Sequence, residues 1–321
     1  MNDISENEAL PVDKAVDEAL EYMPADDGDN SKNRVAGGTL YLVGTPIGNL
    51  SDISPRALKV LTECAFIAAE DTRVTAKLCA RYGIRRPMIQ YHEHNKRDAG
   101  KKIAERLAAG ESCALVTDAG MPGISDPGAD MVKLCCERGL PVTCVPGPCA
   151  ALTALVLSGL PTDRFVFEGF LTSDSAAKRR RRIDELASET RTLILYEAPH
   201  RLAATLKQLF EGFGDRRIAL CRELTKLNEE ILRTTLSEAV IRFGENTPRG
   251  EFVLIIEGCP EKPNELTSLP IAEHVRRYMD NGMTKNDAMK AAARDRGVSK
   301  SVIYRELLDS GEKQTENNPK L

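Results

Sequence analysis

The chain has 321 residues, of which 42% are hydrophobic and 29% are charged, and this predicts a globular protein of two domains. It contains neither an apolar run long enough for a membrane span nor a basic segment followed by an apolar one. We therefore expect no membrane partner and no secretory signal.

Charge is unevenly distributed along the chain. The formal net charge is −4, but residues 1–37 alone carry ten acidic and three basic side chains, so the remainder has a small excess of cations. A mildly basic body is compatible with nucleic-acid binding without establishing it. The nine cysteines form no CxxC pair, which indicates free thiols in a reducing cytoplasm and predicts no metal site.

The acidic segment 1–37 is polar and is predicted to be a disordered arm. Strands and helices then alternate through residues 38–159. Strands are predicted at 39–44, 112–118 and 140–147, and another follows the helix that begins at Pro55; further helices are predicted at 99–110, 127–139 and 148–160. This order is typical of a mostly parallel sheet covered by helices.

The rhythm changes near residue 160, where an aromatic, strand-like run follows Pro161. Strands predicted at 191–197, 216–224 and 250–258, with helices at 200–214 and 235–245, make residues 160–259 a second α/β domain. After a polar linker, residues 265–310 have the pattern of about three helices, the last two resembling a helix-turn-helix. Residues 311–321 are predicted to be a disordered tail.

Three loops rich in glycine and proline follow predicted strands of the first domain: GTPIGN at 44–49, TDAGMPGISDPG at 117–128 and VPGPCA at 145–150. Parallel strands end at one edge of a sheet, so the three loops are expected to form a ligand pocket there. They lack the GxGxxG and Gly-Lys-Ser/Thr patterns, which disfavours NAD, FAD and nucleoside triphosphates. Asp118 is interpreted either as a contact to a ribose or ammonium group or as a turn cap.

Together, LYLVGTPIGNLSDISPRAL, AAEDTRVTAKL, YHEHN, VTDAGMPGISDPG, VPGPCAALTALVLSGLP, FVFEGFL, LYEAPHRL and CRELTKLNEE resemble the ribosomal RNA small subunit methyltransferase I family of the tetrapyrrole methylase superfamily. The resemblance is nearly continuous over residues 38–258. It implies two α/β domains with an S-adenosylmethionine cleft between them, a homodimer, and 2'-O-methylation of a cytidine ribose in the decoding region of 16S rRNA.

The resemblance also implies which residues contact the cofactor. They are Gly44, Thr45, Pro46 and Gly48 in the first loop, Asp118, Gly120, Gly123, Ile124 and Ser125 in the second, Pro146 and Gly147 in the third, and Tyr196 and Leu224 in the second domain.

Several residues are candidates for positioning the target nucleotide or for removing the proton of its hydroxyl group. They are Glu70, Asp71 and Arg73 in EDTR, His92, Glu93 and His94 in YHEHN, and Lys226, Glu229 and Glu230. The residues alone do not choose among them. Arg73 also fits a simple loop-fixing ion pair, and the two histidines also fit local caps.

The run Lys178, Arg179, Arg180, Arg181 and Arg182 is the densest basic stretch in the chain, and we expect it to bind RNA phosphates or to be solvated surface charge. Lys285 and Lys300 of the helical module are also expected to bind rRNA, and a packing or dimer element is the alternative interpretation of this module. Two rival functions are a methyltransferase acting on a tetrapyrrole-like small molecule and a non-catalytic rRNA-binding assembly factor.

Overall fold

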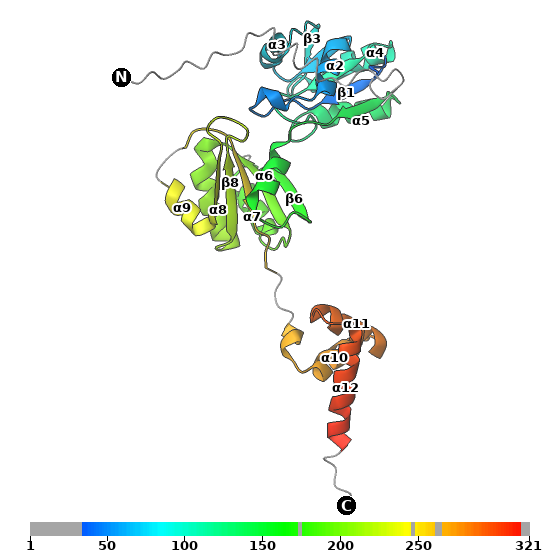
Figure 1. The fold of residues 1–321 in the computed structure, drawn as a ribbon, viewed down its shortest axis with the longest axis vertical. Coiled ribbons are helices and arrows are strands. Elements are labelled where there is room, and N and C mark those ends of the chain that lie inside the picture. Colours follow the sequence, from blue (N-terminus) through cyan, green and yellow to red (C-terminus); the bar gives the residue numbers. More distant parts are fainter. Residues whose placement is uncertain (1–33, 173–174, 245–247, 261–264, 316–321) are drawn as a thin grey trace, which may run out of the picture. The chain divides into compact units, whose positions relative to one another are not determined.

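The computed structural model describes residues 34–172, 175–244, 248–260 and 265–315 (Figure 1). Of the segments predicted to be disordered, residues 1–33 and 316–321 lie outside the described residues. The chain forms two compact units, residues 1–259 and 260–321. In the part that the structure describes, no helix is both long enough and apolar enough to cross a membrane.

The first sheet of unit 1 is entirely parallel. Its strands are β1 (Leu40–Val43), β2 (Phe66–Ala69), β3 (Met88–Gln90), β4 (Cys113–Val116) and β5 (Val142–Val145), and they lie in the order β3-β2-β4-β1-β5. Since β1 lies between β4 and β5, the strands that precede the three glycine- and proline-rich loops are neighbours. All three loops therefore leave the same edge of the sheet, as the sequence predicted.

Helices cover both faces of this sheet. Tyr41 and Val43 face α2 (Pro55–Glu63) and α3 (Thr72–Arg81), whereas Leu40 and Leu42 face α4 (Lys96–Ala108) and α5 (Gly128–Glu137). Successive side chains of a strand point to opposite faces, so a strand buried on both sides is apolar throughout. The helix α3 and the short strand β3 are additions to the elements predicted from the sequence.

The second sheet of unit 1 is mixed. Its order is β6 (Phe165–Phe170), β7 (Thr192–Glu197), β10 (Phe252–Ile256), β8 (Arg217–Arg222) and β9 (Glu230–Thr235), and only β6 and β7 are parallel to each other. One face packs against α7 (Ala176–Leu186), α8 (Leu202–Phe213) and α9 (Leu236–Phe243). The two five-stranded α/β sheets confirm the predicted fold class. β9 was not predicted, because its sequence EILRTT carries two charged residues and is only partly buried.

The helix α6 (Ala150–Ser158) covers the other face of the second sheet, where Ala151, Ala154 and Leu155 pack against Ile194 and Ile255. By packing, α6 thus belongs with the second sheet, although the sequence analysis placed the domain boundary after it, between residues 159 and 160. Strict alternation along the chain predicts that a helix covers the preceding sheet, whereas this helix crosses to the next one.

The basic run 178–182 lies in α7, and its arginine Arg179 is 9% exposed. All five guanidinium N–H groups have acceptors in the residues that surround it: Glu197, Thr205, Gln208 and the carbonyls of Leu171 and Thr172. An arginine has five such donors, so none is left for a phosphate. The predicted RNA contact of Arg179 is therefore wrong, and its role is to pair the buried Glu197.

The neighbouring arginines of α7 are also engaged by carboxylates. Arg180 pairs with Asp184 at 3.1 Å, Arg181 with Glu185 at 3.0 Å and Arg182 with Glu168 at 2.6 Å. Hydrogen bonds to Glu168 and Glu185 raise the pKa of Arg182. Carboxylates four residues further along α7, and one on β6, thus neutralise much of the positive charge of the run 178–182.

Unit 2 consists of η4 (Glu265–Ser268), α10 (Ile271–Asp280), α11 (Lys285–Asp295) and α12 (Lys300–Thr315), so α12 continues beyond the predicted module end at residue 310. Val275, Met289, Ala292 and Ile303 form its own small core. Within it, the buried His274 accepts a hydrogen bond from Arg296 at 3.0 Å and contacts Asp295 at 3.3 Å. Burial and the charge of Arg296 lower the pKa of His274, which favours its neutral form.

We predict that Arg179→Met lowers the free energy of unfolding of unit 1 by about 3–5 kcal/mol, because it removes one of the two arginines that pair with the buried carboxylate of Glu197. Urea denaturation of the full chain, followed by circular dichroism, measures the change. The matched variant Arg181→Met removes a guanidinium that is 83% exposed and should change stability by less than about 0.5 kcal/mol. Equal losses in the two variants would contradict the structural role of Arg179.

Candidate active site

Three loops pack tightly against one another at the carboxyl edge of the first sheet. Thr45 and Gly120 exchange backbone hydrogen bonds of 3.0 and 3.1 Å, and the Thr45 hydroxyl donates to the Thr117 carbonyl at 3.3 Å. A Cβ added to Gly44 would lie 2.7 Å from the Cα of Gly147. The lack of side chains at Gly44 and Gly147 therefore lets the first and third loops touch through their backbones.

The second loop is shaped by Asp126, whose carboxylate accepts backbone N–H bonds from Gly123 at 2.8 Å, Ile124 at 3.1 Å and Gly128 at 2.7 Å. Ser125 has a φ of 65°, which is unusual for a residue with a side chain. Such backbone strain persists where surrounding bonds fix it, and it is frequent at functional sites. Asp126 was not among the predicted site residues, and its loop-capping role is the one the sequence analysis allowed for Asp118.

Two carboxylates lie next to each other at the ends of β2 and β4. Glu70 accepts a 3.4 Å hydrogen bond from the backbone N–H of Asp118, and Asp118 accepts a 3.0 Å bond from that of Asp71. Burial raises the pKa of Glu70, and the negative charges of Asp118 and Asp126 act in the same direction. The pKa of Asp118 is also raised by burial. Paired, partly desolvated carboxylates of this kind are typical of active sites.

Asp71 and Arg73, which follow Glu70, form an ion pair with each other. The guanidinium donates to both oxygens of Asp71, with the shortest distance at 2.6 Å, and these bonds lower the pKa of Asp71 to about 2. Asp71 also caps α3 by accepting the N–H of Arg73 at 2.8 Å. The pair therefore fixes the start of α3, which is the loop-fixing alternative considered from the sequence.

The rings of His92 and His94 stack edge to face with centroids 5.8 Å apart. The Nδ1 atom of His92 is buried and has no hydrogen-bond partner among the described residues. Lys96 bridges Glu93 and Asp130 with distances of 2.7 Å to each. Glu93 thus forms an ion pair at the start of α4. His92, by contrast, lies near Glu70, and no described residue forms a hydrogen bond with its Nδ1 atom.

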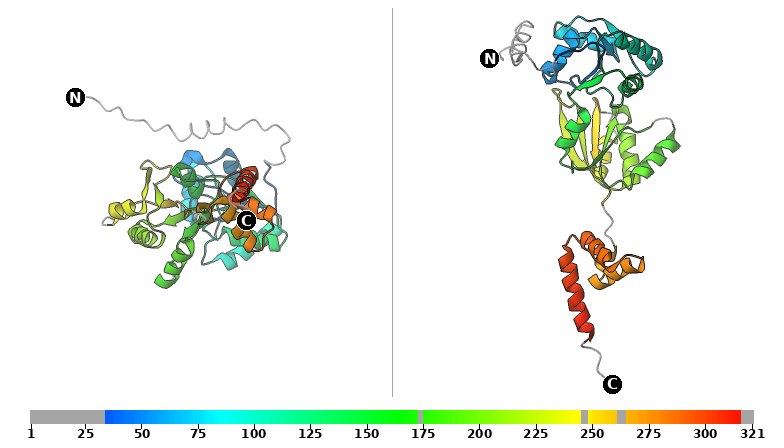
Figure 2. Two further views of the ribbon diagram at one scale, coloured as in Figure 1. Left: turned by 90° about the horizontal axis from the view of Figure 1, so that it is seen from below. Right: turned by 90° about the vertical axis from the view of Figure 1, so that its right-hand side faces the viewer.

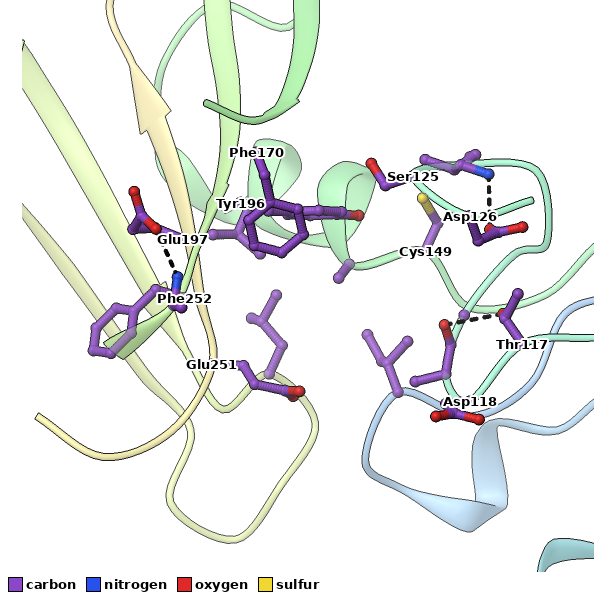
Figure 3. Close-up of a pocket in the computed structure, with 18 of the residues that line it drawn as sticks. Thr117, Asp118, Ser125, Asp126, Cys149, Phe170, Tyr196, Glu197, Glu251 and Phe252 are labelled. Atoms are coloured by element: carbon purple, nitrogen blue, oxygen red, sulfur yellow. Dashed lines mark hydrogen bonds between the residues drawn. The ribbon is translucent and has the colours of Figure 1, made fainter. Parts of the chain in front are cut away.

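A cavity of about 570 Å³ lies between the two sheets (Figure 3). This volume is within the usual range for a small-molecule or cofactor site. Of the candidate residues named from the sequence, eight line it: Glu70, Asp118, Gly120, Ile124, Ser125, Tyr196, Leu224 and Lys226. Thr45, Gly44, Gly123 and Gly147 lie behind this lining and support it, and Pro46, Gly48, Pro146, Asp71, Arg73, His92 and His94 are also absent from the wall.

The opposite wall of the cavity comes from the second sheet, and much of it was not predicted. In Figure 3, Phe170, Tyr196, Glu197, Glu251 and Phe252 lie on the side of the cavity opposite Thr117, Asp118, Ser125, Asp126 and Cys149. Phe252 pairs with Glu197, so the start of β10 meets the end of β7 at this edge. Antiparallel pairing of distant strands produces this meeting, and a single sequence gives no local signal for it.

The loop that joins β8 to β9 closes one side of the cavity. Asn49 donates its N–H to the Thr225 hydroxyl at 3.0 Å, and a Cβ on Gly48 would lie 2.9 Å from the Leu224 carbonyl. Lys226 lines the cavity and pairs with Glu223 at 3.1 Å and Glu251 at 2.9 Å. Burial acts to lower the pKa of Lys226, but hydrogen bonds to the two glutamates outweigh it and keep the amine charged.

The other acidic candidates are also committed to contacts within the loop or the sheet. Glu229 accepts the N–H of Thr225 at 2.7 Å, and Glu230 pairs with Arg222 and Arg242. Among the described residues, no group of three or more His, Cys, Asp or Glu side chains is arranged to hold a metal ion. Glu70 is therefore the carboxylate among the candidate proton acceptors that reaches the cavity wall.

Comparison with known proteins relates the chain to a family model and to several named relatives. The family model described as Tetrapyrrole (Corrin/Porphyrin) Methylases matches residues 39–240. Proteins named ribosomal RNA small subunit methyltransferase I share 48% identity in Halalkalibacterium halodurans and 47% in Bacillus subtilis, each over 83% of this chain and 93% of the relative. The relative in Escherichia coli O157:H7 is 41% identical over 88% of this chain and 96% of its own length.

The chain belongs to the ribosomal RNA small subunit methyltransferase I family. This confirms the resemblance found in the sequence motifs. Among solved structures, a uroporphyrin-III-C-methyltransferase from Thermus thermophilus is 21% identical with a TM-score of 0.50, covering 68% of this chain and 94% of that one. A cobalt precorrin-4 methyltransferase is 16% identical with a TM-score of 0.52, covering 68% and 95%. At these identities the likeness supports the fold alone.

One member of the ribosomal RNA small subunit methyltransferase I family is considerably shorter than this chain. The Thermotoga maritima relative is 44% identical over 221 residues, which are 69% of this chain but 99% of that protein. A chain of that length is too short for both units, and the family model likewise ends at residue 240, before unit 2 begins. The family resemblance is thus carried by the two sheets and the cavity between them.

We predict that Gly44→Ala lowers the free energy of unfolding of unit 1 by about 1–3 kcal/mol, because the added methyl group would push the first and third loops apart. Thermal unfolding of the full chain measures the change. The matched variant Gly100→Ala adds a methyl group in α4 whose nearest neighbour is 3.4 Å away, and it should be neutral or stabilising. An unaltered melting temperature for Gly44→Ala would mean that the loop contact is not tight.

Proposed function

We propose that this chain transfers a methyl group from S-adenosylmethionine to the 2'-oxygen of a cytidine ribose in the decoding region of 16S rRNA. The observation that carries the proposal is the cavity beside Glu70 and Asp118, in a chain 48% identical to a protein named ribosomal RNA small subunit methyltransferase I. The partner is then the small ribosomal subunit or its RNA, and the place of action is the cytoplasm.

The residues of the cavity suit the proposed cofactor. Tyr196, Leu224 and Ile124 supply apolar surface for an adenine ring, and backbone groups of the second loop lie beside Gly120 and Ser125. The acidic edge at Asp118 suits hydroxyl groups or an ammonium group. The remaining predicted contacts, Gly44, Thr45, Pro46, Gly48, Gly123, Pro146 and Gly147, would act by shaping and supporting this lining.

S-adenosylmethionine supplies an electrophilic methyl group carried by a positively charged sulfur. We assign to Glu70 the role of general base, which accepts the proton that the ribose hydroxyl loses. Its place on the cavity wall and its raised pKa suit this role, because a carboxylate with an elevated pKa is a better proton acceptor. Asp118 holds the end of β2 through the N–H of Asp71 and thereby positions Glu70.

His92 and His94 stay predictions as contacts to the target nucleotide, with the unpartnered Nδ1 of His92 as the supporting observation. Lys285 and Lys300 begin α11 and α12, and we propose that these first turns contact rRNA. The Nζ of Lys300 already contacts Asn286, which places it at the joint between the two helices. RNA contact by Lys178, Arg180, Arg181 and Arg182 stays a prediction.

We also propose that the protein is a homodimer. Leu152 and Val156 of α6 are 48% and 71% exposed, and Phe165 at the start of the edge strand β6 is 39% exposed. Apolar side chains on one helix and on a sheet edge favour burial against a second copy.

Light scattering coupled to size-exclusion chromatography measures the assembly state, and a strictly monomeric mass would refute this part of the proposal.

The proposed activity predicts transfer of labelled methyl from S-adenosylmethionine to small ribosomal subunits that lack the modification. Mass spectrometry of the digested RNA should place the label on the 2'-oxygen of one cytidine. Subunits that already carry the methyl group are the control and should accept none. Donor binding measured by calorimetry without any transfer to RNA would instead favour a small-molecule acceptor.

We predict that Glu70→Gln lowers kcat by about 10²–10⁴-fold and leaves the affinity for S-adenosylmethionine unchanged, because it removes only the proton acceptor. In the unaltered protein, kcat should fall as the pH drops through the raised pKa of Glu70, since the protonated carboxyl cannot accept a proton. Single-turnover rates across a pH series measure both effects. A Glu70→Gln variant with an unchanged rate would exclude this residue as the base.

A further inference from the structure

A second basic region of the chain differs from the arginine run of α7 in that most of its cations have no acidic partner in the part of the chain that the structure describes. Residues 72–91 include Arg73, Lys77, Arg81, Arg85 and Arg86 and contain neither aspartate nor glutamate. Among the described residues, Lys77, Arg81, Arg85 and Arg86 form no ion pair, whereas Arg73 binds Asp71. This region therefore keeps a net positive charge, whereas nearby carboxylates neutralise much of the charge of the arginine run in α7.

The helix α3 arranges three of these cations along one side. Arg73, Lys77 and Arg81 recur every four residues and are all exposed, while Thr75 and Cys79 bury the opposite side of the helix. Residues four apart on a helix are neighbours about 6 Å from each other. The helix thus presents a row of regularly spaced positive charges to solvent.

The row leads to a second, smaller cavity of about 240 Å³. Its wall is made by the end of α3 and the segment that leads to β3, and it includes Cys79, Ile84, Arg85, Arg86 and Met88. The Nε of Arg86 donates to the carbonyl of Thr62 at 2.6 Å, which fixes that guanidinium at the wall. A concave surface with two arginines is suited to a phosphate group, which arginine binds through paired N–H donors.

The other end of the row lies at the active site. Asp71 caps the first turn of α3, and Glu70, one residue earlier, lines the main cavity. Figure 1 shows α3 beside β3, at the edge of the first sheet. Beyond the Asp71–Arg73 ion pair, Lys77 and Arg81, which pair with no described carboxylate, thus continue from the active-site end of α3 toward the smaller cavity.

We propose that α3 and the segment after it, residues 73–86, form the surface that binds the sugar-phosphate backbone of the rRNA next to the methylated nucleotide, with one phosphate in the smaller cavity. This inference rests on the proposed function and adds where the RNA lies. Cations that neutralise phosphates release counterions, so they contribute affinity that falls as salt concentration rises. A position beside Glu70 lets this affinity also hold the target ribose at the cavity.

The test uses the full chain and compares Lys77→Ala/Arg81→Ala/Arg85→Ala with the unaltered protein. Binding to a labelled fragment of small-subunit rRNA is measured by fluorescence anisotropy over a salt series, and methylation of the subunit is measured at varied RNA concentration. The control Lys133→Ala/Arg138→Ala/Lys207→Ala removes the same charge from exposed positions on α5, just after α5, and on α8. Calorimetric affinity for S-adenosylmethionine reports on the integrity of the main cavity in each variant.

The proposal predicts that the α3 variant binds RNA roughly tenfold or more weakly, with a salt dependence lower by about two to three counterions. Its KM for RNA should rise in proportion, while kcat at saturating RNA and donor affinity stay unchanged and the control behaves like the unaltered protein. Equal losses in the control would reduce the effect to net charge and overturn the proposal. Normal RNA affinity in the α3 variant would overturn it as well.

Failure of the proposed function itself has a different signature. In that case the unaltered protein would bind the donor and transfer no methyl group to small ribosomal subunits, whatever the behaviour of the variants. An active unaltered protein with an unaffected α3 variant would leave the function intact and reject only residues 73–86 as the RNA surface.

Discussion

The close approach of three loops at the carboxyl edge of the first sheet is the constraint on which the site depends. Gly44 and Gly147 lie so near each other that a methyl group on either would collide with backbone atoms, and Thr45 ties both to the second loop through its bridge to Gly120. The space between the first and third loops is therefore too small for a side chain. These backbone contacts lie behind the cavity wall, and they fix the loops whose residues Asp118, Ile124 and Ser125 line the cavity.

The second sheet supplies the facing wall, and a buried charge network fixes it. Glu197 ends β7 at the cavity, is 3% exposed, and is held by Arg179 from α7 and Arg201 from η3 (Pro199–Arg201). Removing either type of charge would leave the other uncompensated in a low-dielectric interior. The same network that stabilises the second domain thus also sets the position of a residue on the cavity wall.

Charge in this chain has to be judged with its neighbours in space. The five consecutive cations of α7 form the densest basic run, yet one is buried and three bind carboxylates of α7 and β6. Of the sparser cations of α3, Arg73 binds Asp71, whereas Lys77 and Arg81 form no ion pair among the described residues and remain exposed. Field strength at a surface follows from net local charge and exposure, so the sparser run is the better candidate for binding a polyanion.

Local patterns in the sequence predicted a mostly parallel first sheet, the three loops at its edge, the second α/β domain, the helical module and the family. These follow from local patterns: apolar strands buried on both faces, glycine and proline where backbones meet, and motifs that recur in order along the chain. The tertiary structure decided the rest. Antiparallel pairing brought the start of β10 beside the end of β7, and burial turned Arg179 from a surface cation into the partner of Glu197. Desolvation and mutual proximity distinguished Glu70 and Asp118 from the other carboxylates, because both effects depend on residues far apart in the sequence.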